Sequence, residues 1–188
     1  MLADLLNPGE GAAALTKARP APHAGTIREA GLRDLDALTA IENQCFSIDR
    51  ISRSGLRRFL AHRSCTTAGG CTLQARARIL VVENGTHVCG YVLLLMRQNS
   101  RIARIYSLAV APEHRQMGMA RTLLACTESV AMASGRNRIR LEVREDNAAA
   151  IRLYTSVGYR PFDRIASYYE AAPPQVDRTA AIRMEKLI

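Results

Sequence analysis

Two periods of hydrophobic residues run along this chain, one typical of strands and one typical of helices. In RIRLEVR, residues 138–144, apolar and charged residues alternate strictly, which predicts a strand with Arg140, Glu142 and Arg144 on its polar face. An Asn-Gly pair at residues 84–85 is a strong hairpin turn signal between two apolar segments. The other strands are expected at residues 26–30, 77–83, 87–96, 103–111, 159–169 and 179–188.

Apolar residues spaced three and four apart predict helices between these strands. The expected helices cover residues 32–46, 52–63, 118–134 and 148–157, and residues 64–77 are expected to be irregular. Asn147 is a good N-cap for the last helix, and Gly135 and Gly158 are suited to end the last two. This order of strands and helices predicts a mixed α/β sheet with at least one βαβ crossover.

The length of 188 residues favours one domain with a substantial core. Residues 1–25 are rich in Ala, Pro and Gly and show no sustained period, so we expect a flexible tail followed by one domain over residues 26–188. The chain contains no run of about 18 apolar residues, and its first residues do not resemble a signal peptide. We therefore expect a cytoplasmic protein without a membrane partner.

The chain is basic, with 26 Lys and Arg against 17 Asp and Glu, a net charge of +9. A basic chain can bind nucleic acid or an acidic ligand. Only 5% of residues are aromatic and none is Trp, so we expect the charge to lie on a solvated surface rather than to mark a nucleic-acid partner. The five cysteines contain no CxxC pair and the four histidines are scattered, so neither a metal site nor a disulfide framework is expected.

The stretch HRQMGMA, residues 114–120, stands between an expected strand and an expected helix. The N-terminus of a helix carries unsatisfied N–H groups and partial positive charge, which suits a phosphate. Gly118 and Ala120 leave the backbone bare, and Arg115 and Arg121 add positive charge. The stretch therefore suits an anion site, and tight packing of the helix start against the strand is the alternative explanation of its small residues.

A second stretch, RLEVREDNAAAIRLYTSVGYRPF, carries a carboxylate and a phenol near the same end of the expected sheet. Glu142 lies on the polar face of its strand, and Tyr154 lies two turns into the next helix. Ligands of open α/β sheets bind beyond the C-terminal ends of the strands. Together with a phosphate cradle, these two residues indicate proton transfer around a phosphorylated cofactor.

The two stretches together resemble the GNAT superfamily of N-acetyltransferases, most closely its bacterial ribosomal-protein-alanine N-acetyltransferase (RimI-type) branch. The phosphate signature of the superfamily is Gln or Arg, two residues, Gly, one residue, and Gly or Ala; Arg115, Gly118 and Ala120 meet it. The resemblance covers about Thr26 to Ile188. It implies an acyl-CoA N-acyltransferase fold, with a central, mostly antiparallel sheet and a βαβ core that binds acetyl-CoA.

The resemblance also implies roles for the matching residues. Glu142 would take a proton from the substrate ammonium, and Tyr154 would give one to the departing CoA thiolate. Backbone groups at Leu108 and Val110 would hold pantetheine and the acetyl carbonyl, and Asn147 would contact the pantetheine arm. The implied cofactor-binding set is Leu108, Ala109, Val110, Arg115, Gln116, Met117, Gly118, Met119, Ala120 and Asn147. No metal is implied.

Each of the three side chains also has a purely structural explanation. Glu142 could pair with Arg140 or Arg144 on a solvated strand face. Tyr154 could be a half-buried core aromatic, and Asn147 could be a helix cap only.

The segment CFSIDRISRSGLRRFL, residues 45–60, departs from the pattern of the branch, which has Pro and aromatic residues there. Its arginines, Arg50, Arg53, Arg57 and Arg58, favour a neutral or acidic acceptor over a polybasic one, unless they point to water. The first interpretation is an acetyl-CoA-dependent acetyltransferase of protein N-terminal amines. The alternatives are acetylation of a lysine or small amine, and a non-catalytic acyl-CoA-binding or nucleic-acid-binding module.

Overall fold

The computed structural model describes residues 25–47, 49–61, 65–66, 72–73, 76–169 and 179–188. The tail expected for residues 1–25 lies outside these residues except for Gly25, as does most of the irregular segment expected at residues 64–77. Among the described helices, none combines the length and the apolar character needed to cross a membrane.

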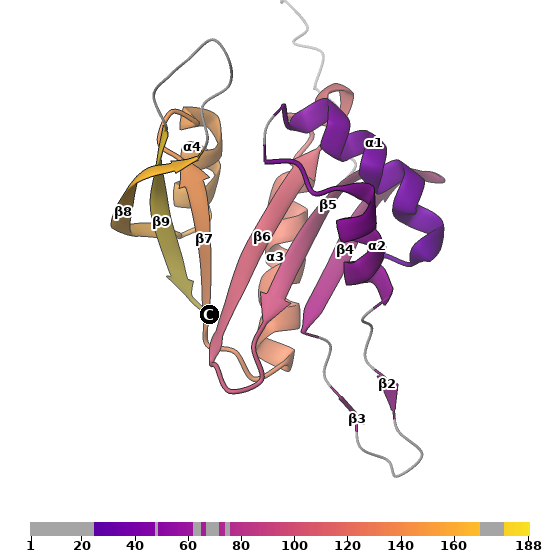
Figure 1. Cartoon of the computed structure of the whole chain (residues 1–188), viewed down its shortest axis with the longest axis horizontal. Helices are drawn as coiled ribbons and strands as arrows, with labels where there is room; N and C mark the ends of the chain where they lie inside the picture. The colour runs from indigo at the N-terminus through magenta and orange to yellow at the C-terminus, as the bar shows by residue number, and fades with distance from the viewer. Residues whose placement is uncertain (1–24, 48, 62–64, 67–71, 74–75, 170–178) are drawn as a thin grey trace, which may run out of the picture.

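Seven strands form one mixed sheet in the order β1-β4-β5-β6-β7-β9-β8 (Figure 1). Their bounds are β1 Thr26–Glu29, β4 Ala77–Asn84, β5 His87–Met96, β6 Ile102–Val110, β7 Arg138–Arg144, β8 Arg160–Tyr169 and β9 Thr179–Leu187. Every neighbouring pair is antiparallel except β6 and β7, which are parallel and are joined by a helix. The predicted mixed sheet with a βαβ crossover is therefore confirmed.

Helices cover both faces of the half of the sheet formed by β4, β5 and β6 (Figure 1). Helices α1 and α2 lie on one face and α3 on the other; the helical bounds are η1 Leu32–Asp34, α1 Leu35–Cys45, α2 Arg53–Ala61, η2 Pro112–His114, α3 Met119–Ala133 and α4 Ala148–Ser156. One core packs α3 against alternate strand residues such as Val92 and Ile105, and a second packs α1 and α2 against residues such as Val81 and Leu93. Burying each such side chain contributes roughly 1.5–3 kcal/mol.

Most predicted elements are confirmed, with three local differences. The expected first helix begins as the short 3₁₀ turn η1 before α1, and the hairpin after β4 turns at Gly85 and Thr86, one residue later than the Asn-Gly signal. The segment expected to be irregular includes a two-stranded pairing of β2, Cys65–Thr66, with β3, Thr72–Leu73.

A buried polar cluster ties α1 to the sheet and was not anticipated from the sequence. Glu42 is 1% exposed, accepts the hydroxyl of Tyr91 on β5, and lies 3.4 Å from the Ser107 hydroxyl of β6. Its second oxygen accepts the backbone N–H of Ile51 at 3.1 Å, in the connection between α1 and α2. The cluster therefore fixes the position of this connection relative to β6.

We expect the Glu42→Gln variant to change how stability depends on pH. Burial raises the pKa of Glu42 above its ordinary 4.5, although hydrogen bonds from Ile51 and Ser107 oppose the shift. A carboxyl with a raised folded-state pKa contributes stability below its unfolded pKa and loses that contribution as pH rises through the folded value. Glutamine does not titrate, so the free energy of unfolding of the parent protein should fall relative to the variant as pH rises above 4.5. Urea unfolding across this range measures the difference, and a constant difference would contradict the prediction.

Candidate active site

Strands β6 and β7 separate soon after they meet. Their parallel pairing covers only residues 102–104 of β6 and 138–140 of β7, and toward their C-terminal ends the two strands diverge (Figure 1). A bulge in β6 lies just beyond the last pair, because Leu93 of β5 faces Ser107 while Leu94 faces Ile105, which leaves Tyr106 as the extra residue. Bulges bend and twist a strand. The bulge therefore accounts for part of the divergence.

A pocket of about 600 Å³ occupies the space where the two strands diverge. It is lined by residues of β6, β7, β8, α4 and its N-cap, the end of α1 and the connection between α1 and α2, namely Cys45, Phe46, Ser47, Asp49, Ile51, Arg104, Ile105, Tyr106, Ser107, Leu108, Leu141, Glu142, Val143, Arg144, Asn147, Ala150, Tyr154 and Tyr168. Four residues predicted for the site, Leu108, Glu142, Asn147 and Tyr154, therefore meet in one pocket. Ala109, Val110 and residues 115–120 do not line it.

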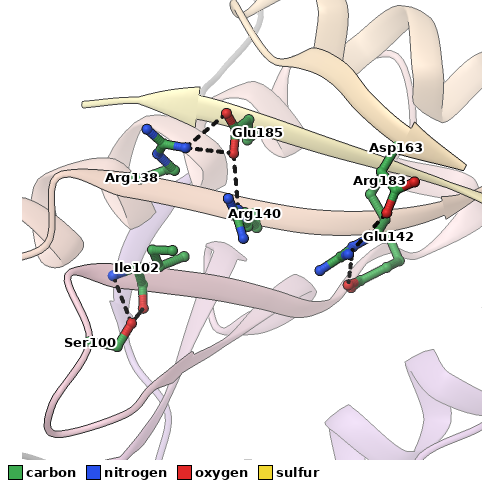
Figure 2. A network of polar contacts seen from close by, with 8 residues as sticks. All are labelled: Ser100, Ile102, Arg138, Arg140, Glu142, Asp163, Arg183 and Glu185. Atoms are coloured by element: carbon green, nitrogen blue, oxygen red, sulfur yellow. Dashed lines mark hydrogen bonds and ion pairs between the residues drawn. The ribbon is translucent and has the colours of Figure 1, made fainter.

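Glu142 lies on the polar face of β7, as the alternation predicts, with its side chain 11% exposed. Its Oε2 accepts the Nε–H of Arg104 of β6 at 2.7 Å, and its Oε1 lies 3.8 Å from Arg183 of β9. Arg183 also donates to Asp163 of β8 at 3.1 Å, as Figure 2 shows. The suggested partners Arg140 and Arg144 are therefore not the ones observed: they pair with Glu185 and Asp146.

Tyr154 and Asn147 reach the pocket from α4. Asn147 caps the helix, because its side-chain oxygen accepts the backbone N–H of Ala150 at 3.0 Å. Tyr154 is 8% exposed and packs edge-to-face on Tyr159, with ring centroids 5.8 Å apart. Tyr154 therefore belongs to the core and also lines the pocket. For Tyr154 and for Asn147, the structural role does not exclude a role in the site.

The stretch predicted to hold an anion forms the uncapped start of α3. Gly118 is the N-cap residue, in the left-handed region with φ of 81°, and it supplies no side-chain cap. The first helical hydrogen bond beyond it runs from Thr122 N–H to Gly118 O at 3.1 Å, so within the described residues the N–H groups of residues 119–121 have no helical acceptor. Gln116 also has a positive φ, 63°.

The bare backbone of this stretch fits a phosphate. A Cβ at Gly118 would meet no protein atom within 4 Å, so the glycine is not required by packing against the strand. The stretch joins the pocket through Arg115, whose side chain donates to Val110 O at 3.2 Å and lies 3.6 Å from Cys45, a pocket residue. Packing against the strand therefore does not explain Gly118, whereas its left-handed φ of 81° does, and the backbone N–H groups that follow it are left accessible.

Several polar residues of the pocket were missed by sequence reasoning. Arg104, Tyr106 and Tyr168 line it, and the only sequence signal for the first two was their spacing of two residues along a strand. The arginines expected to meet the acceptor do not line it: Arg50 donates to Asn43 and Arg53 pairs with Asp36, both on α1. Among the described residues, no three His, Cys, Asp or Glu side chains are grouped to hold a metal ion.

Comparisons with known proteins agree with this geometry. A curated N-acetyltransferase of Methanocaldococcus jannaschii is 31% identical over 145 residues, which cover 77% of this chain and 83% of the relative. The solved ribosomal-protein-S18-alanine N-acetyltransferase of Escherichia coli shares the fold with a TM-score of 0.72 and 23% identity, over 87% of this chain and 94% of that one. A PaiA N-acetyltransferase of Thermoplasma acidophilum, solved in complex with coenzyme A, matches with a TM-score of 0.67 and 17% identity, over 87% and 98% of the two chains.

The family comparison settles which proteins this chain is related to. The profile of the acetyltransferase (GNAT) family matches residues 35–159, from the start of α1 to the end of the turn after α4, and so includes residues 114–120 and every pocket residue except Tyr168. The expected family and fold are confirmed. The chain belongs to the acetyltransferase (GNAT) family and is an acetyl-CoA-dependent N-acetyltransferase.

Proposed function

We propose that the protein acetylates N-terminal α-amines of proteins or peptides. The observation that carries the proposal is that Glu142 and Tyr154, one on β7 and the other on α4, line the same pocket where β6 and β7 diverge. The structural likeness to an enzyme that acts on an alanine of ribosomal protein S18 supports this class of acceptor.

Residues 115–120, the cradle at the start of α3, would hold the pyrophosphate of acetyl-CoA. The N–H groups at the start of α3, with Arg115 and Arg121 nearby, suit its charge. Beyond Arg104, β6 forms no ladder pair with β7 among the described residues, so the backbone on this side of β6 near Leu108 and Val110 would be available to a pantetheine arm, apart from the Val110 carbonyl that accepts from Arg115. Asn147 lines the pocket beside this strand.

The chain's side chains would move two protons. Bound acetyl-CoA supplies an acetyl group activated as a thioester. Glu142 would take a proton from the acceptor ammonium, so that the nitrogen lone pair becomes free to attack. Tyr154 would donate its hydroxyl proton to the departing sulfur. The backbone N–H groups of β6 would stabilise charge on the carbonyl oxygen.

A panel of acceptors tests the proposed function. Peptides with free or blocked N-termini, with and without an internal lysine, and small amines are incubated with acetyl-CoA, and mass spectrometry locates the acetyl group. Acetylation of free N-termini alone is the expected result. Transfer to lysine side chains or small amines instead would show that the acceptor class is wrong while the acetyltransferase activity stands.

We expect the Gly118→Ala variant to bind acetyl-CoA more than tenfold more weakly, a loss of at least about 1.4 kcal/mol. The added methyl group meets no protein atom but stands on the bare backbone of the cradle and strains a left-handed residue. Gly135→Ala is the matched control, because Gly135 lies at the other end of α3 with φ of 74° and is equally free of neighbours. Both variants should lose about 1–2 kcal/mol of stability. If calorimetry shows equal affinities in the two variants, residue 118 is not part of the cofactor site.

A further inference from the structure

Arg104 is a basic side chain of the pocket with a guanidinium nitrogen that still has hydrogen-bond donors to offer. The pocket is lined by two basic residues, Arg104 and Arg144. Arg144 is engaged in a two-point pair with Asp146, at 3.0 and 2.8 Å. Arg104 uses its Nε on Glu142 and one Nη on the Tyr168 hydroxyl, at 2.7 and 3.2 Å, while its other Nη makes no hydrogen bond within the described part of the chain.

The guanidinium of Arg104 is held in a fixed plane. Glu142 and Tyr168 bind its edge, and the ring of Tyr106 lies under it, 5.7 Å from Cζ to the centroid. Tyr106 in turn packs on Phe59 of α2 at 6.1 Å. Burial alone would lower the pKa of Arg104, but the charge of Glu142 and the contact with Tyr168 raise it above its ordinary value. A guanidinium with this support is preorganised to bind a planar carboxylate.

The position of Arg104 fixes how far such a carboxylate can be from the acceptor amine. Arg104 touches Glu142, the proposed base, so a group bound to its free Nη lies within a few ångströms of the reacting nitrogen. The side chain is 40% exposed and can therefore be reached from the pocket. Besides Glu142, the acidic residue in the pocket lining is Asp49. It is exposed to solvent, which screens its repulsion of an acidic acceptor.

We propose that Arg104 selects acceptors that carry a carboxylate close to the amine, in the first or second residue of a peptide. The inference rests on the proposed function and names its substrate class. An acceptor carboxylate bound to the free Nη leaves the hydrogen bond from Arg104 Nε to Glu142 in place, so Glu142 stays positioned to receive the amine proton. The same arginine thus holds the acidic group of the acceptor and the proposed base side by side.

Isosteric acceptor pairs test this proposal directly. Peptides that differ only as Asp against Asn, at position one or at position two, are compared by kcat/KM, and their binding to the CoA complex is measured by calorimetry. The parent protein should prefer the Asp peptide about tenfold at one of the two positions, since a charge-assisted hydrogen bond is of this size. Arg104→Gln should bring the ratio to about one, and Arg104→Lys should restore part of it, because the charge returns without the planar fork.

The ratio of kcat/KM for the Asp and Asn peptides distinguishes a loss of acceptor selectivity from a general loss of activity. If Arg104→Gln only misplaces Glu142, it slows both peptides equally and the Asp-to-Asn ratio of kcat/KM stays as in the parent protein. That result would overturn the proposal, and so would a parent protein that does not prefer the Asp peptide. Arg164→Gln is the control, because Arg164 pairs with Glu145 outside the pocket, at 2.7 Å, and its loss should leave the ratio intact.

An amino acid and its amide are included as small acceptors. If only they are acetylated, the N-terminal function fails while their ratio still decides the role of Arg104; if nothing is acetylated by a protein that binds acetyl-CoA, both proposals fail.

Discussion

Replacing Glu142 by Gln is expected to lower turnover roughly 10²-fold at neutral pH, within the usual range for general-base catalysis. An α-ammonium has a reference pKa of about 8, so most of the acceptor is protonated at pH 7 and cannot attack. Glu142 is the carboxylate of β7 that faces the pocket, and it is only 11% exposed. Glutamine keeps the shape and the hydrogen bond from Arg104 but cannot take the proton.

The pH dependence of kcat in the parent protein and in Glu142→Gln tests whether Glu142 is the general base. As pH rises, free amine becomes abundant without help, so the difference in kcat between the parent protein and Glu142→Gln should shrink, while acetyl-CoA affinity changes little. Glu185→Gln is the matched control: Glu185 lies on the same side of the neighbouring strand and pairs with Arg138 and Arg140, but it does not line the pocket (Figure 2). Full turnover of Glu142→Gln at pH 7 would show that water or another carboxylate removes the proton.

The elements of the site were predictable because their signals are local. Strict alternation in residues 138–144 sets the faces of β7 whatever its neighbours are, and burial follows it residue by residue. Asn147 caps α4 through a bond that spans three residues. Gly118 stands at the start of α3, where the small residues predicted a bare backbone at a helix N-terminus. Each of these features depends on a few adjacent residues.

The partners of these residues could not be predicted, because sheet order brings together residues far apart in sequence. The structural alternative paired Glu142 with Arg140 or Arg144. Side chains two apart on a strand compete with those of the neighbouring strands, and the observed partners Arg104 and Arg183 come from strands on either side. The Glu42 cluster joins residues 49 and 65 positions apart. The bulge at Tyr106 is visible only in the register of β5 and β6.

The same limit explains why the arginines of residues 50–58 were assigned to the acceptor. Helical spacing told which residues share a face of α2, but not that Arg53 lies against Asp36 of α1. The preference for neutral or acidic acceptors stays a prediction, and its structural basis moves from these residues to Arg104. Charge counted along the chain locates a basic segment, whereas the fold decides which of its guanidinium groups reach the pocket.

Tyr154→Phe is expected to lower turnover by roughly tenfold or more. The expected loss can fall below the about 10²-fold or more that is usual for general acid catalysis, because a thiolate leaves more easily than an alkoxide. The loss should persist as pH rises, in contrast to that of Glu142→Gln, because free amine does not replace a missing proton donor. The phenyl ring still packs on Tyr159, so the fold and the affinity for acetyl-CoA should be kept. Steady-state kinetics across the same pH range as for Glu142→Gln measures the contrast.

Tyr159→Phe is the control that separates proton donation from the loss of any buried hydroxyl. Tyr159 packs against Tyr154 in the same core and is 1% exposed, but it does not line the pocket, and its hydroxyl has no hydrogen-bond partner among the described residues. Removing a buried hydroxyl without a partner costs no hydrogen bond and relieves its desolvation, so this variant should be at least as stable as the parent and equally active. If Tyr159→Phe lost as much turnover as Tyr154→Phe, the effect would come from packing of the aromatic pair, and Tyr154 would not be the proton donor.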